Sequence, residues 1–184
     1  MLAPFVFFIK LFEFLLNLAE IVFVGGFYVI WEAIGFGTMS EKENGTCVGT
    51  PQSNLRWNVE YDVANWVSCF NRHLAENRNY AFTGDRTYLT YLESSGTDIT
   101  YYDSITGKPL FYGPKSRSMK EFLDESQPSG WPSFRQDEVN WDNVEVFWDG
   151  EIFSVDGTHL GHNLPDELGN RYCINLSSIA GNQI

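Results

Sequence analysis

The first 37 residues are largely apolar, and in this respect they differ from the rest of the chain. The window 14–31 carries a single charge, Glu20, and its length is near the lower limit for crossing a bilayer. The many Phe, Leu, Ile and Val residues offset part of the cost of placing Glu20 in a membrane. We therefore expect residues 1–38 to form an apolar helix that anchors the protein in a membrane or lies in its interface.

Two other interpretations of this leader stay open. A cleaved signal peptide usually has a basic n-region and a small-residue cleavage site, and neither is clear here. The third interpretation is that translation begins at Met39, because "MSEKENGT" is typical of a soluble N-terminus. The leader favours membrane association or the secretory pathway, whereas a start at Met39 favours the cytoplasm.

The segment 39–57 is polar, contains Gly, Pro and charged residues, and is interpreted as a linker. It includes a glycosylation sequon, Asn44-Gly45-Thr46, which matters only in the secretory pathway. Residues 58–184 are expected to form one domain dominated by antiparallel strands, with helices before them.

Local patterns in this domain predict its elements. An apolar stripe with helical spacing follows Asp62 and predicts a helix that Asp62 caps. The run "SMKE" has the capping-box spacing and predicts a short helix ending near Glu125. The run "VEVFWDGEIFSV" predicts a hairpin with a two-residue turn at Asp149-Gly150. Further strands are expected in "TYLTYL", "DITYYD" and "RYCINL". The residues of the stripe are Val63, Trp66, Val67, Phe70 and Leu74.

Composition and charge narrow the possible functions. The chain has 184 residues, enough for one domain plus appendages, and its 16% aromatic content favours strands. A net charge of −12 argues against nucleic acid as a partner, because an acidic chain neutralises no phosphates. The cysteines Cys47, Cys69 and Cys173 include no CxxC pair, which excludes a four-cysteine zinc site. We expect no metal, no organic cofactor and a monomeric protein.

The run "GTHLGHNLPDELGNRYCIN" gathers chemically reactive residues, namely His159, His162 and Cys173. Because residues two apart in a strand face the same side, Arg171, Cys173 and Asn175 are expected to share a face. A cysteine is nucleophilic as its thiolate, which nearby cationic or hydrogen-bonding groups favour. A lone cysteine in a strand is usually a small buried apolar residue, but this combination favours a nucleophilic site.

Four blocks of the sequence resemble the B-type methionine sulfoxide reductases, which reduce the R epimer of methionine sulfoxide. The blocks are "YYDSITGKPLF", "SGWPSF", "DGTHLGHNLPD" and "GNRYCIN", and the resemblance covers about residues 100–181. The motif "GWPSF", and the pairing of "HLGH" with "RYCIN", are specific. The resemblance implies a mainly β, α+β fold of two small antiparallel sheets with a few short helices.

The resemblance also implies roles for individual residues. Cys173 is expected to be the catalytic nucleophile, with Arg171 supporting its thiolate electrostatically. His159, His162 and Asn175 are expected to hydrogen-bond around the sulfoxide and the thiolate. The expected substrate-binding residues are Trp131, which would pack on the substrate methyl group, and Phe134.

The chain departs from the family pattern in its zinc positions. Many members bind zinc through two CxxC pairs, so this part of the domain is expected to be held by packing alone. The corresponding positions fall at Asp103 and Thr106, and near Phe153 and Asp156.

A second departure concerns the resolving cysteine, which often directly precedes "GWPSF" where this chain has Ser129. Recycling must then use Cys69, Cys47 or an external thiol, and Cys69 is the possible resolving cysteine within the chain because its predicted helix keeps it near the domain. Cys47 lies in the predicted linker and would be ordered at a higher cost. A bond between Cys69 and Cys173 also requires Cα atoms within about 7 Å.

The implied reaction reduces methionine sulfoxide, free or protein-bound, to methionine. The Cys173 thiolate attacks the sulfur while a histidine protonates the oxygen, and a sulfenic acid forms on Cys173. A second thiol condenses with the sulfenic acid, and the resemblance implies thioredoxin as the reductant. Two alternatives stay open. One is a Cys–His hydrolase or acyltransferase with Asn175 as the orienting residue, and the other is a catalytically silent β module tethered to a membrane.

Overall fold

The computed structural model describes residues 38–71, 75–83, 87–96 and 99–184. Residues 38–184 form one compact unit. The predicted apolar helix of residues 1–38 lies, apart from Thr38, outside the described residues. Within the described part of the chain, no helix combines the length and the apolar character needed to cross a membrane.

The described strands form two antiparallel sheets. They are β1 (Ile99–Tyr102), β2 (Pro109–Gly113), β3 (Ser133–Phe134), β4 (Val144–Val146), β5 (Glu151–Ser154), β6 (His159–Asn163) and β7 (Tyr172–Ile174). β1 and β2 pair with each other, and the larger sheet has the order β3-β7-β6-β5-β4. The last strand in the sequence therefore lies between β3 and β6, inside the larger sheet.

Three α-helices lie among the described residues, and short helical turns connect the elements. They are α2 (Tyr61–Asn65), α3 (Thr87–Ser95) and α4 (Met119–Ser129), with 3-10 turns η1 (Arg56–Asn58), η3 (Tyr80–Phe82), η4 (Gln136–Glu138) and η5 (Leu176–Ser178). α2 runs directly into a π-helical turn, η2 (Trp66–Phe70). The predicted α+β fold with two antiparallel sheets is confirmed.

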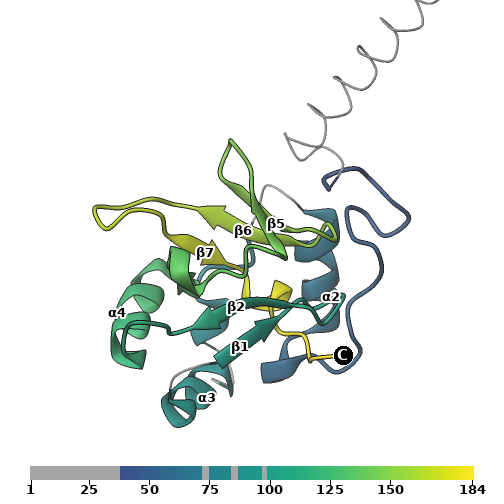
Figure 1. Ribbon diagram of the computed structural model, residues 1–184. Coiled ribbons are helices and arrows are strands. Elements are labelled where there is room, and N and C mark those ends of the chain that lie inside the picture. The colour runs from purple at the N-terminus through teal and green to yellow at the C-terminus, as the bar shows by residue number, and fades with distance from the viewer. Residues whose placement is uncertain (1–37, 72–74, 84–86, 97–98) are drawn as a thin grey trace, which may run out of the picture. The chain divides into compact units, whose positions relative to one another are not determined.

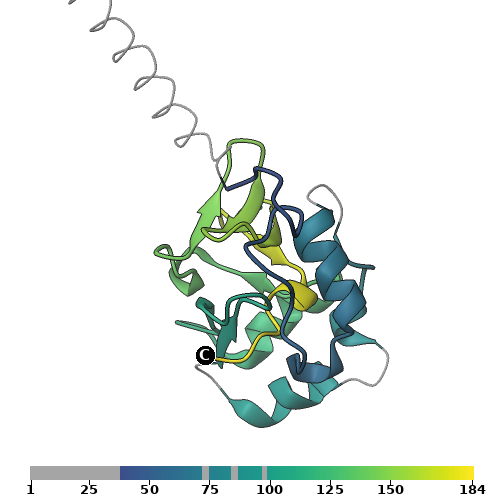
Figure 2. The same cartoon turned by 90° about the vertical axis from the view of Figure 1, so that its right-hand side faces the viewer.

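The helices lie around the sheets. Figure 1 shows α4 and α2 at opposite ends of the sheets, with α3 beyond β1. α4 contacts β3, whereas η2 contacts both β6 and η5. Figure 2 shows α2 and the turn after it beside the C-terminal segment that carries η5. η5, which follows β7, therefore packs against α2 and η2 from the N-terminal half of the domain.

Phe134 lies in an aromatic cluster that joins both sheets to α4. Its ring is stacked on that of Phe111 at 4.5 Å and meets Tyr101 edge-to-face at 4.9 Å. The Phe122 ring lies at 5.5 Å, and all four side chains are fully buried. Burying an aromatic side chain of this size contributes roughly 1.5–3 kcal/mol, so this cluster is a main source of stability.

The run "TYLTYL" lies in α3 and not in a strand, so the prediction from its Tyr and Thr content is wrong. The buried residues of α3 are Tyr88, Leu89 and Leu92, which recur at helical spacing. The Tyr88 ring packs against Trp57 at 4.8 Å, and its hydroxyl lies 3.1 Å from that of Tyr101. Packing of this apolar face against the core outweighs the modest strand preference of Tyr and Thr.

The helix predicted after Asp62 is present, but its buried face differs from the predicted stripe. Glu60, and not Asp62, occupies the N-cap position, and no side chain caps this end. Trp66 and Phe70 are 60% and 48% exposed. The change from α to π geometry at Trp66 shifts which residues face inward, so regular α-helical spacing no longer applies. The buried residues are Ala64, Val67, Ser68 and Cys69.

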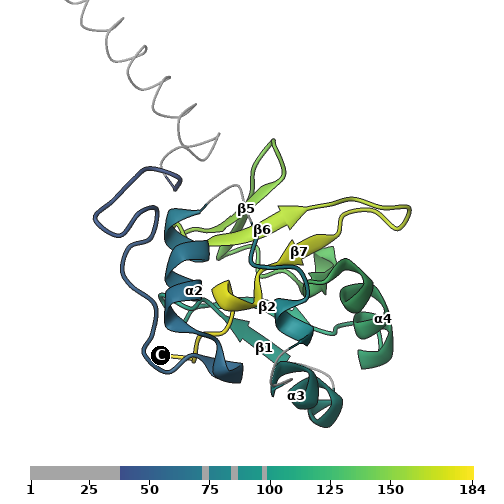
Figure 3. The same cartoon turned by 180° about the vertical axis from the view of Figure 1, so that it is seen from behind.

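Residues 39–57 were interpreted as a linker, but they belong, with Thr38, to the compact unit. Figure 3 shows this segment running along α2 toward the C-terminal end. Thr46 and Cys47 are buried, and Gln52 Nε2 donates to the carbonyl oxygen of Asn182 at 3.0 Å. The domain therefore begins before residue 58, because polar residues of this segment bond to a distant part of the chain.

Two local predictions are confirmed with changes of detail. Ser118 and Glu121 form the capping box that opens α4, which continues to Ser129 rather than ending near Glu125. β4 and β5 form the predicted hairpin. Its turn is longer than two residues, since the Gly150 N–H donates to the Phe147 carbonyl oxygen and Gly150 has a positive φ of 90°.

Candidate active site

Four residues from four neighbouring strands form a row across the larger sheet. The register pairs Ser133 with Cys173, Cys173 with His162, and His162 with Glu151. Directly opposite residues of antiparallel strands face the same side, with Cβ atoms about 4.5–5.5 Å apart. The sheet thus sets a hydroxyl, a thiol, an imidazole and a carboxylate side by side. We call these four residues the Cys173 row.

The strand pairing beside this row depends on Gly161 of the "HLGH" motif. Gly161 pairs with Ile174 in β7. A Cβ atom at Gly161 would lie 2.1 Å from the carbonyl oxygen of Cys173, which is far inside contact distance. Only glycine lets β6 approach β7 closely enough to place His162 beside Cys173.

Glu151 joins the two histidines. Its Oε2 lies 2.7 Å from His159 Nε2, and its Oε1 lies 2.9 Å from His162 Nε2. A bulge in the pairing of β5 with β6 lets both imidazoles reach the same carboxylate. His159 Nδ1 also lies 3.4 Å from the Val67 carbonyl oxygen in η2. Because His159 is buried and the His162 side chain is 29% exposed, His162 is the one more open to a substrate.

The carboxylate of Glu151 and the imidazole of His162 stabilise each other's charged forms. Burial favours the neutral acid, but hydrogen bonds from His159 and His162 outweigh it and lower the pKa of Glu151 to about 2. The hydrogen bond to Glu151 raises the pKa of His162 above its ordinary value, against the effect of burial. His162 therefore keeps its proton to a higher pH than a free histidine, as suits a general acid near neutral pH.

Cys173 is a buried thiol beside two hydroxyl groups. Its Sγ lies 3.7 Å from Ser133 Oγ, which lies 3.1 Å from Ser129 Oγ. Burial raises the pKa of Cys173, and hydrogen bonding to Ser133 and the charge of Arg171 offset only part of that rise. The thiolate is thus a minor species at neutral pH, and the hydroxyl groups are positioned to stabilise it when it forms.

Arg171 precedes β7 and is not part of it, because the strand covers only Tyr172–Ile174. The Leu164 N–H donates to the Arg171 carbonyl oxygen at 2.8 Å, so the backbone pairing of β6 with β7 extends to Arg171, and the predicted sharing of one face by Arg171, Cys173 and Asn175 stays a prediction. Arg171 Nε donates to the Leu164 carbonyl oxygen at 3.3 Å and lies 3.6 Å from Asp166 Oδ2. Its charge still favours the Cys173 thiolate from this position.

Trp131 follows α4 directly. Gly130 ends the helix with a φ of 92°, a left-handed conformation that glycine adopts without strain. Trp131 is partly buried, and its indole Nε1 donates to the carbonyl oxygen of Glu76 at 3.3 Å. Ser129 and Trp131 thus lie only a few positions before β3 in the chain. β3 in turn pairs with β7, the strand that carries Cys173.

Phe134 was expected to bind substrate, but the structure places it in the aromatic core. Successive residues of a strand point to opposite sides of the sheet. Ser133 therefore points to the same side as the rest of the Cys173 row, and Phe134 points to the other side. Phe134 is fully buried against Tyr101, Phe111 and Phe122. Its assignment as a substrate-binding residue is corrected on this ground.

Asn175 lies just beyond β7 and is buried. Its Oδ1 accepts a hydrogen bond from the Glu76 N–H at 3.0 Å. The side chain is thus held through its oxygen, and its buried Nδ2 donors are left without a partner among the described residues.

Glu151, His159 and His162 also form a group that could hold a metal ion, since one ligand atom from each lies within 4.8 Å of the others. Two imidazoles and a carboxylate suit zinc or non-haem iron. In this structure both Nε2 atoms lie at hydrogen-bond distance from Glu151, a geometry that protons account for.

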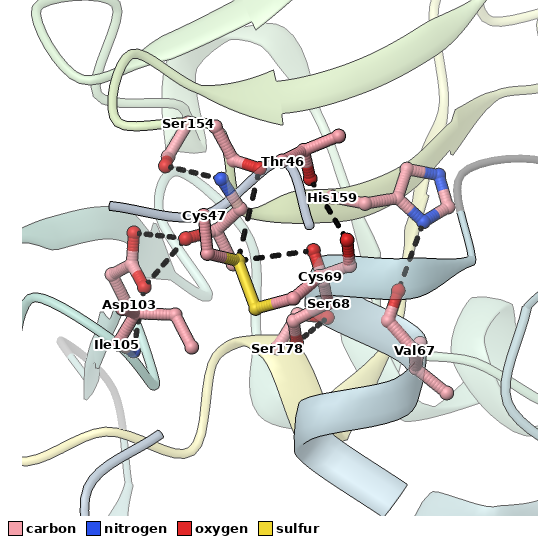
Figure 4. The surroundings of a disulfide bond; sticks show 12 residues. Thr46, Cys47, Val67, Ser68, Cys69, Asp103, Ile105, Ser154, His159 and Ser178 are labelled. Carbon is pink, nitrogen blue, oxygen red and sulfur yellow. Dashed lines mark hydrogen bonds between the residues drawn. A yellow bond between two sulfur atoms is a disulfide. The ribbon is translucent and has the colours of Figure 1, made fainter. Parts of the chain in front are cut away.

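Cys69, the predicted resolving cysteine, is bonded to Cys47, with Cα atoms 5.1 Å apart. Figure 4 shows this disulfide beside Ile105, where segment 38–57 meets η2. The Thr46 N–H donates to the Cys69 carbonyl oxygen at 2.9 Å, and this contact holds the two segments together. Cys173 is the free cysteine, so an internal disulfide with Cys69 is not supported.

We expect peptide mapping under non-reducing conditions to find Cys47 bonded to Cys69 and Cys173 free. The two cysteines are 22 positions apart, and closing a loop of this size contributes about 3 kcal/mol. A double variant, Cys47→Ser with Cys69→Ser, should lower the free energy of unfolding in denaturant by about that amount. A map that shows Cys69 bonded to Cys173 would contradict this pairing.

Polar contacts occupy the region where the resemblance places the zinc cysteines. Asp103 is buried, and its two oxygens accept from Thr158 Oγ1 at 3.0 and 2.9 Å. Its Oδ1 also accepts from the Ile105 N–H at 2.8 Å, and Lys108 pairs with Asp156 at 2.7 Å. The expectation that packing alone holds this region is therefore wrong.

A surface cavity of about 1140 Å³ lies beside α4, and its lining includes Arg117, Glu125, Arg135 and Trp141. None of the Cys173 row is in that lining. Arg117 Nη2 donates to the Ser133 carbonyl oxygen at 2.8 Å, so the charged wall of the cavity supports β3. The cavity and the Cys173 row are separate features that share this strand.

Sequence reasoning missed Glu151 and Glu76. Glu151 carries one faint signal, a charged residue opening an otherwise apolar strand beside the predicted turn. Glu76 lies in a polar run with no motif, and only the folded chain reveals its contacts. No known protein family and no curated protein matches the chain in sequence comparisons.

Proposed function

We propose that the protein reduces methionine-R-sulfoxide to methionine, with Cys173 as the nucleophile and His162 as the acid. The observation that carries the proposal is the Cys173 row, in which a thiol lies directly between a hydroxyl and an imidazole paired with a carboxylate. The sequence motifs "GWPSF", "HLGH" and "RYCIN" meet at this row and support the same activity.

In the proposed step the oxygen atom moves from the substrate sulfur to the Cys173 sulfur. The Cys173 thiolate attacks the substrate sulfur while His162 gives its proton to the sulfoxide oxygen, and the proton that the thiol released to solvent balances the one that the imidazole regains from solvent. One thiol and one sulfoxide become one sulfenic acid and one thioether. The Cys173 sulfur is oxidised, and the substrate sulfur is reduced by the same two electrons.

Regeneration in this proposal uses a thiol from outside the chain. Ser129 occupies the position expected for a resolving cysteine, and Cys69 is bonded to Cys47. The sulfenic acid on Cys173 condenses with one external thiol and releases water, and a second thiol then frees Cys173. A dithiol of the thioredoxin type supplies both thiols.

The Cys–His hydrolase alternative has less support. In such an enzyme the histidine contacts the nucleophile directly. Here the Nε2 atoms of His159 and His162 both contact Glu151, and the thiol of Cys173 contacts Ser133.

The test offers both epimers of a chromophoric methionine sulfoxide to the full-length protein, first with dithiothreitol and then with thioredoxin and its reductase. The R epimer should be consumed and the S epimer spared. Consumption of neither epimer would refute the proposal. An acyl-enzyme formed on Cys173 with an activated ester would favour the hydrolase.

Replacing Trp131 with alanine should raise the KM for the R epimer by about tenfold or more and reduce the preference for that epimer. The reason is that the indole supplies the apolar surface for the substrate methyl group. The matched control is Trp148→Ala, since Trp148 is 87% exposed, and it should leave both values unchanged. If the two variants have the same KM and the same epimer preference, Trp131 does not bind the substrate.

A further inference from the structure

Glu76 is a buried acid whose carboxylate binds the main chain beyond β7. One oxygen accepts from the Leu176 N–H at 2.7 Å, and the other accepts from the Ser177 N–H at 3.0 Å. The residue is 4% exposed. These two bonds fix residue 76 against a segment that begins three positions after Cys173.

The main chain of Glu76 contacts two candidate site residues. Its N–H donates to Asn175 Oδ1 at 3.0 Å, and its carbonyl oxygen accepts from Trp131 Nε1 at 3.3 Å. One residue therefore bonds to both the amide after the nucleophile and the indole after α4. The contact with Asn175 also fixes which way its amide points, because the Glu76 N–H is a donor and can bond only the oxygen of that amide.

This direction matters for the proposed chemistry. Because Glu76 occupies Asn175 Oδ1, the Nδ2 donors are left without a partner among the described residues. An amide in the opposite orientation would place an oxygen where the donors now lie, and it would repel a sulfoxide oxygen. The contact with Trp131 likewise fixes the indole that is assigned to the substrate methyl group.

The cost of burying Glu76 suggests that the acid has a specific role. Burial raises the pKa of Glu76 to about 7, although the hydrogen bonds from Ser177 and Leu176 pull it down. A buried carboxyl group is expensive, and an apolar residue of similar size would avoid this cost.

We propose that Glu76 is a positioning residue of the Cys173 site, whose carboxylate fixes its own main chain so that it orients Asn175 and Trp131. The proposal deepens the reductase function and rests on it for its effect on turnover. The positioning itself can be measured without activity.

The test is Glu76→Gln in the full-length chain, because the glutamine amide can accept from only one of the two N–H groups and turns a donor toward the other. The matched control is Asp103→Asn, a second buried acid that accepts from a backbone N–H, of Ile105, and from Thr158. If Glu76→Gln does not fold, Glu76→Asp is measured instead. This variant keeps the negative charge on a side chain that is one methylene group shorter.

Three readouts are combined: the Trp131 indole signal, backbone amide exchange and the kinetics with the two epimers. The Trp131 indole N–H is followed by NMR, assigned with Trp131→Phe, together with the exchange rates of the Leu176 and Ser177 amides. In Glu76→Gln the indole signal should shift, those amides should exchange about tenfold faster, and the KM for the R epimer should rise about tenfold with lower epimer preference. Asp103→Asn should change none of these values.

An unchanged indole signal and unchanged amide exchange in Glu76→Gln would overturn the proposal, whatever the activity. Altered signals with wild-type KM and epimer preference would also overturn it, because positioning would then be irrelevant to substrate. If the wild type reduces neither epimer, the reductase function fails, and the NMR result still decides whether Glu76 holds Asn175 and Trp131.

Discussion

Replacing Cys173 with serine is expected to abolish reduction of the R epimer and leave the fold intact. A serine hydroxyl is hardly ionised near neutral pH and cannot take up the oxygen atom as a sulfenic acid. The two residues have similar size, and the site is already bordered by the hydroxyl groups of Ser133 and Ser129. Turnover is measured with the two epimers, and folding is measured by thermal unfolding.

The control for this variant is the double variant of Cys47 and Cys69, which removes the two disulfide-bonded cysteines and keeps Cys173. It should retain reduction of the R epimer at temperatures where it stays folded. Turnover that persists in Cys173→Ser would exclude the proposed mechanism altogether.

The second large effect is expected at His162. His162→Ala should lower turnover by roughly 10²–10⁴, the usual range for removing a positioned acid or base. Glu151→Gln should act on the same group in a different way. Because the carboxylate raises the pKa of His162, its loss should move the limb of the turnover profile that reports His162 to lower pH.

The sign of this pH dependence follows from the two groups. Turnover should be lost in strong acid, where Cys173 is a thiol, and in strong alkali, where His162 has lost its proton, so the profile should be bell-shaped. The matched control is Glu145→Gln, a glutamate on the neighbouring strand β4 that accepts from Thr38 at 3.1 Å. If Glu145→Gln and Glu151→Gln give the same profile, Glu151 does not set the protonation of His162.

Predictions from the sequence were correct where a single short run of residues determines the local backbone conformation. The capping box at Ser118 and the Gly150 turn each specify a backbone conformation within a few residues, and both features are present. The α3 segment was assigned wrongly because its residue types favour a strand, whereas the spacing of Tyr88, Leu89 and Leu92 suits a helix.

The candidate site was only partly predictable. The motifs identified Cys173, His159 and His162, and the strand register brings Cys173 beside His162. Contacts between distant segments were not predictable, and they include the Glu76 bonds and the disulfide of Cys47 and Cys69. Such pairings depend on how segment 38–57 and η2 pack, and no single run of residues encodes them.

Ser133 and Phe134 are adjacent on a two-residue strand, one beside Cys173 and the other in the aromatic core. This arrangement constrains how the protein can change over generations. A substitution that repacks Phe111 or Phe122 shifts Phe134, and through the shared backbone it shifts the hydroxyl that contacts Cys173. If the proposed function holds, changes in the aromatic core would therefore alter the rate of the reaction as well as the stability of the fold.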